Sequence, residues 1–476
     1  MLTNCGLPRI VPATQDNKHT ELAVNHTATS PNTATIPTAK GLPLIGSLLQ
    51  MVRNPLTALM VMTQENGSMF FVKILHKKLL VMGGVDVNRF LSEEGKDCII
   101  SEEQWKDLSA YWQCPHMLIA IDGQPHIDER RQWKRYISRE VAHGEQDKLF
   151  DVIRQFMDEH TEKDNVAVNP FCRSLITREL SYLFTHEIFQ LPPDLAESIG
   201  EYLKMLLVVK LNKSLPAFVL RLPFFRRHEK RVQAFGADLL RRARTKLDED
   251  SLFSMAIKRV DADPARNEAE LLPILLTPFI AGLDTLASSL TFLFQELLNN
   301  PMLTARVRAD VDAACAANNG QLPPPENMRA IPSLFGLCQE VLRYYPVAFG
   351  TLRHAAKDFS YRGRAVQKGQ QIMFFTAAPH FDERYFRSAD QFDIDRFLEP
   401  RMEQRARYAF SPYGRGPHIC LGAALAESIF LSTTACLLRD YEFTATENGK
   451  RYPMIFNPGP SLPNRFRMLI RRRTST

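Results

Sequence analysis

One short stretch, residues 410–422, constrains this chain of 476 residues more than any other feature. It reads Phe-Ser-Pro-Tyr-Gly-Arg-Gly-Pro-His-Ile-Cys-Leu-Gly, and residues 423–427 directly after it are mostly strong helix formers. Cys420 therefore stands at a predicted helix start, where unpaired amide protons and the positive end of the helix dipole favour a thiolate. The glycines let the backbone approach a flat ligand closely. The stretch predicts a thiolate ligand for iron, and the alternative is an ordinary loop around a buried cysteine.

This stretch resembles the haem-binding signature of the cytochrome P450 family, of the soluble, bacterial-like type. In that signature a phenylalanine and a glycine precede the cysteine and another glycine follows it, and we assign Phe410, Gly414, Cys420 and Gly422 to these places. The resemblance implies haem b as the cofactor and Cys420 as the axial ligand, whose thiolate favours cleavage of the O–O bond. His418 stands where the family usually has an arginine that binds a haem propionate, and histidine also donates to carboxylates.

Two further motifs precede this stretch, in the order in which that family has them. Glu340 and Arg343 are spaced i, i+3, which puts a carboxylate and a guanidinium on one helix face and is similar to the family's E-x-x-R. The segment 392–397 resembles the family's P-E-R-F segment and makes Arg396 the third, structural member. An isolated E-x-x-R pair has little value on a helix surface. The order of all these motifs along the chain is what supports the resemblance.

Residues 269–300 show the longest helical pattern, apolar on most faces and disturbed by Pro278, which lacks the amide proton for its i−4 bond. Within it, Ala281-Gly-Leu-Asp284-Thr285 is similar to the family's A-G-x-D-T motif at the oxygen-binding site. A glycine and a threonine in mid-helix fit a local widening. The resemblance implies that Thr285 holds a proton-bearing water and that Asp284 relays protons from solvent. The alternative is a threonine bonded back to its own helix.

Three more basic residues are candidates for binding the haem propionates. His126 and Arg130 share one helix face at i, i+4 and resemble the family's H-x-x-x-R pair. Arg353 resembles another propionate ligand, on a strand after the E-x-x-R helix. Without the resemblance, the expected interpretation of each of the three residues is a basic side chain exposed to solvent.

The substrate pocket is expected, by position, to be lined by apolar residues: Ile280, Ala281, Val347, Ala348, Phe349 and Leu462. Such a lining suits a lipid, a terpene, a polyketide or another hydrophobic natural product better than a charged metabolite.

The remaining patterns predict a mainly α-helical fold with a small β region, the cytochrome P450 fold. Helical periodicity runs from about residue 85 to 345, and alternating runs at 69–74 and 78–82 predict a hairpin. Residues 1–36 are rich in Thr, Asn and Ala and predict a disordered leader, which leaves 37–476 as a single haem-thiolate domain.

The net charge of +6 is concentrated between Arg221 and Lys246, a stretch that contains nine basic and two acidic residues. Aromatic residues do not alternate with these charges as a stacking groove requires, so we expect no nucleic acid partner. The stretch predicts a solvated helix face, with peripheral membrane contact through 221–246 as the alternative. The longest apolar run, 271–283, is shorter than the roughly 18–20 residues of a transmembrane helix.

The eight cysteines form no C-x-x-C pair, which favours a reduced, cytoplasmic setting for a soluble protein. We expect a monooxygenase of secondary metabolism that hydroxylates or epoxidises an apolar substrate. No G-x-G-x-x-G fingerprint is present, so we expect electrons from a separate ferredoxin or flavodoxin-type donor and its reductase. Basic residues near the ligand loop suggest a docking face for that donor: Arg401, Arg405, Arg407 and Arg415. Alternatives are a haem-thiolate enzyme that uses peroxide or rearranges a hydroperoxide, and a non-catalytic haem-binding module.

Overall fold

The computed structural model describes residues 35–163, 165–187, 193–211, 213–247, 249–447, 449–456 and 459–473. The predicted leader, 1–36, lies outside the described residues except for its last two positions. The chain packs into two units, each made of discontinuous segments. The first comprises Met1–Ile100, Ala348–Phe392 and Glu403–Ile419, and the second comprises Ser101–Val347, Asp393–Met402 and Cys420–Thr476.

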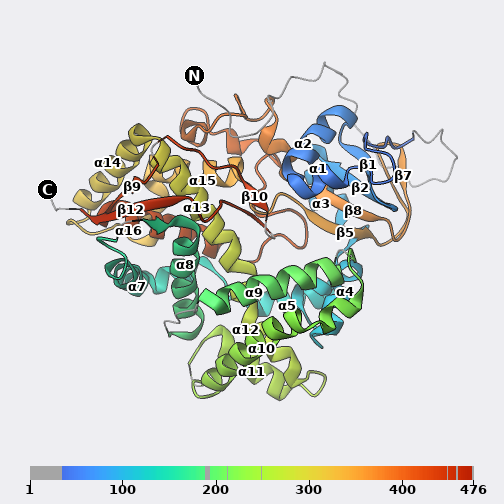
Figure 1. The fold of residues 1–476 in the computed structure, drawn as a ribbon, viewed down its shortest axis with the longest axis horizontal. Helices are drawn as coiled ribbons and strands as arrows, with labels where there is room; N and C mark the ends of the chain where they lie inside the picture. The colour runs from blue at the N-terminus through green and yellow to red at the C-terminus, as the bar shows by residue number, and fades with distance from the viewer. Residues whose placement is uncertain are drawn as a thin grey trace. The chain divides into compact units, whose positions relative to one another are not determined.

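The first unit is built on a five-stranded sheet with the strand order β1-β2-β8-β5-β3 (Figure 1). Its strands are β1 (Met69–Ile74), β2 (Lys77–Gly83), β3 (Ile99–Ile100), β5 (Thr351–Ala355) and β8 (Gln371–Phe375). β2 and β8 are parallel, and the other neighbours are antiparallel. The predicted hairpin is confirmed, with Phe70 opposite Val81. Met69, Leu80 and Phe374 are buried in a common core on this sheet.

The first unit also contains three α-helices and a second hairpin: α1 (Leu48–Arg53), α2 (Pro55–Asn66), α3 (Val85–Ser92), β6 (Phe359–Tyr361) and β7 (Arg364–Val366). The start of α2 is stabilised by local contacts. Pro55 occupies the first helical position, and the Asn54 side chain accepts a hydrogen bond of 3.0 Å from the Thr57 amide. Phe90 of α3 joins the core on the sheet, which fixes this helix against the strands.

The second unit is mainly helical. Its α-helices are α4 (Glu102–Tyr111), α5 (Gly123–Lys134), α6 (Arg139–Gly144), α7 (Gln146–Asp158), α8 (Val168–Thr185), α9 (Pro193–Leu206), α10 (Pro223–Arg244), α11 (Leu252–Ala262), α12 (Leu271–Thr277), α13 (Asp284–Asn299), α14 (Pro301–Ala317), α15 (Pro332–Tyr344) and α16 (Ala423–Asp440). Its strands are β4 (Val166–Ala167), β9 (Tyr441–Ala445) and β12 (Arg467–Arg472) in one sheet, and β10 (Ile455–Phe456) with β11 (Pro460–Ser461) in another. A mainly α-helical fold with a small β region is thereby confirmed.

The long apolar helix of the sequence is a continuous run, Glu268–Asn299, composed of a short 3-10 turn, α12, the π-helical segment Pro278–Leu283 and α13. The π segment begins at Pro278, so the predicted disturbance and local widening are confirmed. By length and composition alone the run could cross a membrane, with a mean hydropathy of 1.6, but 61% of that apolar window is buried inside the protein. α13 packs against α8, α14 and α15, as a core helix does.

Candidate active site

Cys420 lies just before α16, with Gly422 as the residue that precedes the helix. Its side chain is exposed, whereas five other cysteines are buried: Cys114, Cys172, Cys315, Cys338 and Cys436. Although its side chain is accessible, the protein packed around the thiol desolvates it and raises its pKa, while the Gly422 amide and the Arg130 charge act in the opposite direction. A metal ion bound at the thiol would favour the thiolate.

The turn before the cysteine requires glycine at Gly416. Its φ is +81°, and a Cβ there would lie 2.6 Å from the Leu91 carbonyl oxygen. Gly414 also has a positive φ, of +75°, but faces open space. Counted back from Cys420, the family's spacing F-x-x-G-x-x-x-C-x-G falls on Tyr413 and Gly416. The assignment of its first two fixed places to Phe410 and Gly414 is therefore wrong.

Phe410 has a different structural role within the first unit. Its ring lies 5.4 Å from the ring of His380 and 6.4 Å from that of Phe386, measured between centroids. The His380 Nε2 accepts a hydrogen bond of 2.9 Å from the Ser411 amide. The aromatic cluster therefore holds the start of the turn that leads to the cysteine.

Glu340, Arg343 and Arg396 are brought together in the second unit, and all three side chains are fully buried. Both oxygens of Glu340 accept hydrogen bonds of 2.7 Å from Arg343, and Arg396 Nε donates to Glu340 at 3.1 Å. The approach of the Arg396 segment depends on Gly336 of α15, where a Cβ would lie 2.7 Å from the Ile394 carbonyl oxygen. Each of these charges would be very costly to bury alone, and the pairing of the carboxylate with two guanidinium groups offsets that cost.

Asp284 and Thr285 begin α13, directly after the π segment. The Thr285 hydroxyl lies 3.1 Å from the Ala281 carbonyl and 3.2 Å from the Gly282 carbonyl, so the back bond considered from the sequence is formed. The Asp284 carboxylate forms an ion pair with Arg173 of α8. Sequence reasoning missed Arg173, because no motif links it to Asp284, 111 residues away.

His126 and Arg130 lie one turn apart on α5; the first is buried and the second is half-buried. Burial lowers the pKa of the Arg130 guanidinium, and the nearby Cys420 raises it. Within the described part of the chain, no carboxylate pairs with Arg130. A desolvated guanidinium without a carboxylate, close to an exposed thiol, fits a ligand that carries both a metal and an acid group.

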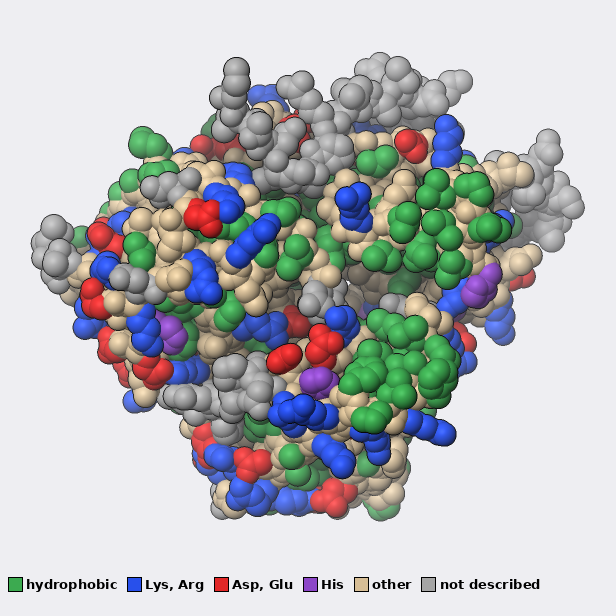
Figure 2. Space-filling model, viewed as in Figure 1, with side chains coloured by type: hydrophobic (Ala, Val, Ile, Leu, Met, Phe, Trp, Pro, Cys, Tyr) green, Lys and Arg blue, Asp and Glu red, His purple; other side chains and the backbone are tan. Residues whose placement is uncertain are grey.

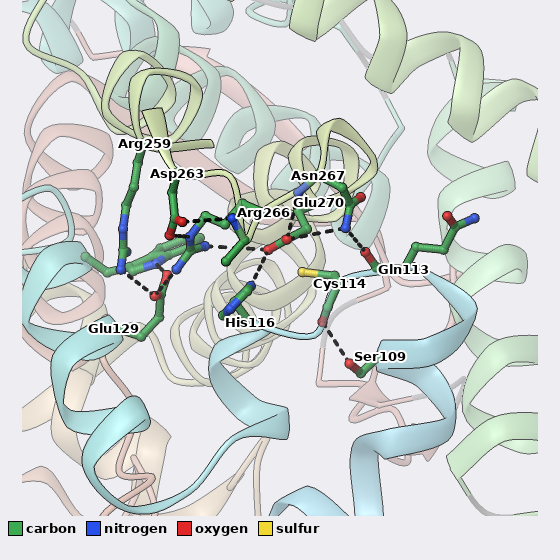
Figure 3. Close-up of polar contacts among 12 residues, drawn as sticks. Ser109, Gln113, Cys114, His116, Glu129, Arg259, Asp263, Arg266, Asn267 and Glu270 are labelled. Carbon is green, nitrogen blue, oxygen red and sulfur yellow. Dashed lines mark hydrogen bonds and ion pairs between the residues drawn. The ribbon is translucent and has the colours of Figure 1, made fainter. Parts of the chain in front are cut away.

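α5 is tied to the start of the long helix by a charged cluster in the second unit (Figure 3). Glu129, the neighbour of Arg130, forms ion pairs with Arg266 at 2.7 Å and Arg259 at 2.8 Å. Arg266 also lies 3.5 Å from Glu270, whose carboxylate is 3.0 Å from the His116 Nδ1. Sequence reasoning missed this cluster, whose members come from three separate segments. It positions the helix that carries His126 and Arg130.

Arg353 lies on β5 of the first unit and is buried, where it donates to the Thr351 hydroxyl at 2.6 Å and the Leu352 carbonyl at 2.7 Å. His418 is half-buried in the turn before Cys420. The roles of both residues in binding a propionate stay predictions.

The six predicted substrate residues differ in exposure. Ala281 and Ala348 are exposed, Ile280, Val347 and Phe349 are half-buried, and Leu462 is fully buried. Ile280 and Ala281 belong to the π segment, whereas Leu462 contributes no accessible surface of its own. Their joint lining of one pocket stays a prediction.

The donor set fits haem better than a metal held by protein alone. Over the described residues, no group of three or more His, Cys, Asp and Glu side chains is placed to hold a metal ion. A single thiolate at Cys420 would need a chelator that supplies the remaining ligands, as a porphyrin does.

The cytochrome P450 family model matches residues 36–465. A sterol 14alpha-demethylase of Mycolicibacterium vanbaalenii is 31% identical over 209 residues, which are 44% of this chain and 46% of that protein. The cyclooctat-9-en-7-ol 5-monooxygenase of Streptomyces melanosporofaciens is 28% identical over 235 residues, 48% of this chain and 50% of that one. The matches thus span about half the length of these two relatives.

Among solved structures, a retinoic acid-bound cyanobacterial cytochrome P450 superposes with a TM-score of 0.76 at 20% identity, over 92% of this chain and 100% of that one. This likeness shows the fold. The family model covers nearly the whole chain, and the two relatives are named as a demethylase and a monooxygenase. The chain belongs to the cytochrome P450 family, whose cofactor is haem b.

Proposed function

We propose that this chain, with residues 37–476 as one catalytic domain, is a haem-thiolate monooxygenase that hydroxylates or epoxidises an apolar organic substrate. The observation that carries the proposal is the pair Asp284 and Thr285, directly after the π segment. An acid beside an alcohol supplies the protons that the reduction of O2 consumes. Enzymes that use peroxide and modules that only bind haem have no need of such a pair.

Each proposed site residue has a defined task. Haem, when bound, supplies the redox chemistry that activates O2. Cys420 would ligate its iron, and four basic side chains would bind its propionates: His126, Arg130, Arg353 and His418. The Thr285 hydroxyl would hold a proton close to the reacting oxygen, and Asp284 would receive the next proton from solvent while Arg173 orients its carboxylate.

The proposed substrate is a hydrophobic molecule such as a lipid, a terpene or a polyketide, which would place the enzyme in secondary metabolism. The names of the two relatives, for a sterol and for cyclooctat-9-en-7-ol, support this class. All seven described cysteines are free, which supports the proposed cytoplasmic location.

The proposed electron donor is a ferredoxin or a flavodoxin with its reductase. The basic residues considered as its docking face are partly neutralised already. Arg401 pairs with Asp393 at 2.6 Å and Arg407 lies 3.2 Å from Glu93, whereas Arg415 donates to the Ser411 hydroxyl, which does not compensate its charge. These contacts leave less positive charge for an acidic donor than the sequence suggests, so we expect a modest salt dependence of electron transfer.

The proposal is tested by comparing two ways of driving turnover. Apolar compounds that shift the Soret band are incubated either with NAD(P)H and a surrogate ferredoxin and reductase, or with hydrogen peroxide alone. Product that requires O2 and the reductase supports the monooxygenase. Product with peroxide alone identifies the peroxide-using alternative. Haem-replete protein that binds these compounds without product in either arm identifies a binding module.

Thr285→Ala should keep haem content and substrate binding while electrons leak to hydrogen peroxide, because the proton held at the hydroxyl is lost. The measurement is the ratio of product formed to NAD(P)H consumed. The matched control is Thr291→Ala, which removes a similar back bond, of 2.7 Å to the Ala287 carbonyl, from the same helix. Equal ratios in the two variants would remove Thr285 from the mechanism.

Arg173→Met should slow turnover because it removes the cation that orients Asp284. Asp284→Asn should slow it by about a hundredfold or more, in the range of a lost general acid. If Arg173 acts through Asp284, the double variant is no slower than Asp284→Asn, and the two effects are not additive. Additive losses would show that Arg173 contributes in another way.

A further inference from the structure

α3 carries an asparagine side chain that is completely removed from solvent. Charged side chains are spread over the face of the molecule seen in Figure 2, as the cost of burying polar groups leads us to expect. Asn88, in the middle of α3, is instead 0% exposed. Its Nδ2 lies within hydrogen-bond distance of three acceptors: the Thr376 carbonyl oxygen at 2.9 Å, the Tyr408 carbonyl oxygen at 3.0 Å and the Ser411 hydroxyl at 3.2 Å. One amide thus joins α3, within the first unit, to the end of β8 and to the turn that leads to Cys420.

The amide of Asn88 is used for donation only. Its Oδ1 is buried and has no hydrogen-bond partner within the described part of the chain. The surrounding acceptors fix the orientation of the amide, because a reversed amide would point its oxygen at two carbonyl oxygens. A buried oxygen without a partner costs stability, so packing alone does not explain an asparagine at this place. What Asn88 supplies is a pair of N–H donors for the two segments beside α3.

The backbone of Tyr408 needs such support. Its φ is +66°, in the left-handed region, which is unfavourable for an aromatic residue. The Tyr408 carbonyl accepts from Asn88, and the Tyr408 hydroxyl donates to Glu93, which directly follows α3. A strained backbone of this kind persists only when its surroundings hold it, and such strain is concentrated at functional sites. α3 therefore holds the strained residue by its backbone and by its side chain.

We propose that Asn88 is a positioning residue for the iron ligand. By fixing residues 408–411 it sets the path of the turn that delivers Cys420, and it acts through the backbone of that turn. The same helix contacts the turn again at Gly416, four residues before Cys420, where the Leu91 carbonyl leaves no room for a Cβ. The inference rests on the proposed role of Cys420 and adds a residue that no motif in the sequence points to.

The experiment compares Asn88→Asp with the wild type, both full-length and haem-loaded. Aspartate is nearly the same size, but its carboxylate accepts hydrogen bonds and cannot donate them to the Tyr408 and Thr376 carbonyls. We expect haem to pass to apomyoglobin about 10- to 100-fold faster, the range for a lost outer partner of a metal ligand. Part of the red-shifted carbon monoxide band should be replaced by an unshifted band, and the reduction potential of the haem should move.

A second variant and a control make the result decisive. Asn88→Leu removes the donors without adding a charge; it should change the same three quantities in the same direction, and it decides the matter if Asn88→Asp does not fold. The control is Ser92→Ala, which removes a hydrogen bond of 2.7 Å from the Ser92 hydroxyl to the Asn88 carbonyl, within α3 and away from the turn. It should keep the wild-type haem transfer rate, band and potential.

The outcomes separate this inference from the assignment of the ligand itself. If the Asn88 variants melt at a lower temperature but keep the wild-type potential, band and haem transfer rate, Asn88 is merely structural and the proposal is overturned. A wild-type protein without the red-shifted band would overturn the role of Cys420, and this inference with it.

Discussion

Replacing Cys420 with serine should abolish the red-shifted Soret band that the reduced protein shows under carbon monoxide. The band reports a thiolate ligand, and a serine hydroxyl, which stays protonated near neutral pH, is a poor substitute. Cys420 is the exposed cysteine of the described chain, whereas five others are buried, with no accessible thiol to replace it. The measurement is the carbon monoxide difference spectrum, with haem content determined on the same samples.

Cys98→Ser is the control for this substitution, because Cys98 is the other described cysteine that is not buried. Its spectrum should match that of the wild type. A red-shifted band that persists in Cys420→Ser would show that another residue ligates the iron, and the proposed site would then be wrong.

The second large effect is expected at Glu340. Glu340→Ala leaves the fully buried Arg343 and Arg396 without their shared carboxylate, which should cost roughly 3–5 kcal/mol in the free energy of unfolding. The expected result is poor folding and lost haem. Urea unfolding monitored by circular dichroism measures the cost, and the Soret absorbance measures the haem.

Arg306→Ala provides a matched control in the same region. Arg306 pairs with Asp395, the neighbour of Arg396, but the two side chains are 46% and 50% exposed. Removing an exposed pair should cost only about 0–1 kcal/mol. A Glu340→Ala protein that is stable, haem-replete and altered in its product would place Glu340 at the substrate instead of in the structural network.

Several features followed from the sequence because they depend on residues close together in the chain. The hairpin of β1 and β2, the start of α16 after Gly422 and the disturbance of the long helix at Pro278 are all of this kind. Local backbone preferences and periodicity specify such elements. The contacts of Glu340 with Arg343 are equally local, at i, i+3, whereas the place of Arg396 was inferred only through the family resemblance.

The tertiary structure alone decided which charges meet between segments far apart in the chain. The pairing of Arg173 with Asp284 joins helices 111 residues apart, and Arg266 lies 137 residues from Glu129. Packing likewise decided that the end of the basic stretch is neutralised, since Arg241, Arg244 and Lys246 pair with Asp238, Asp261 and Glu187. The burial that raises the pKa of Cys420 depends on neighbours folded around it. A sequence determines which local elements form, but the partner of a charge and the solvation of a thiol depend on how distant elements pack.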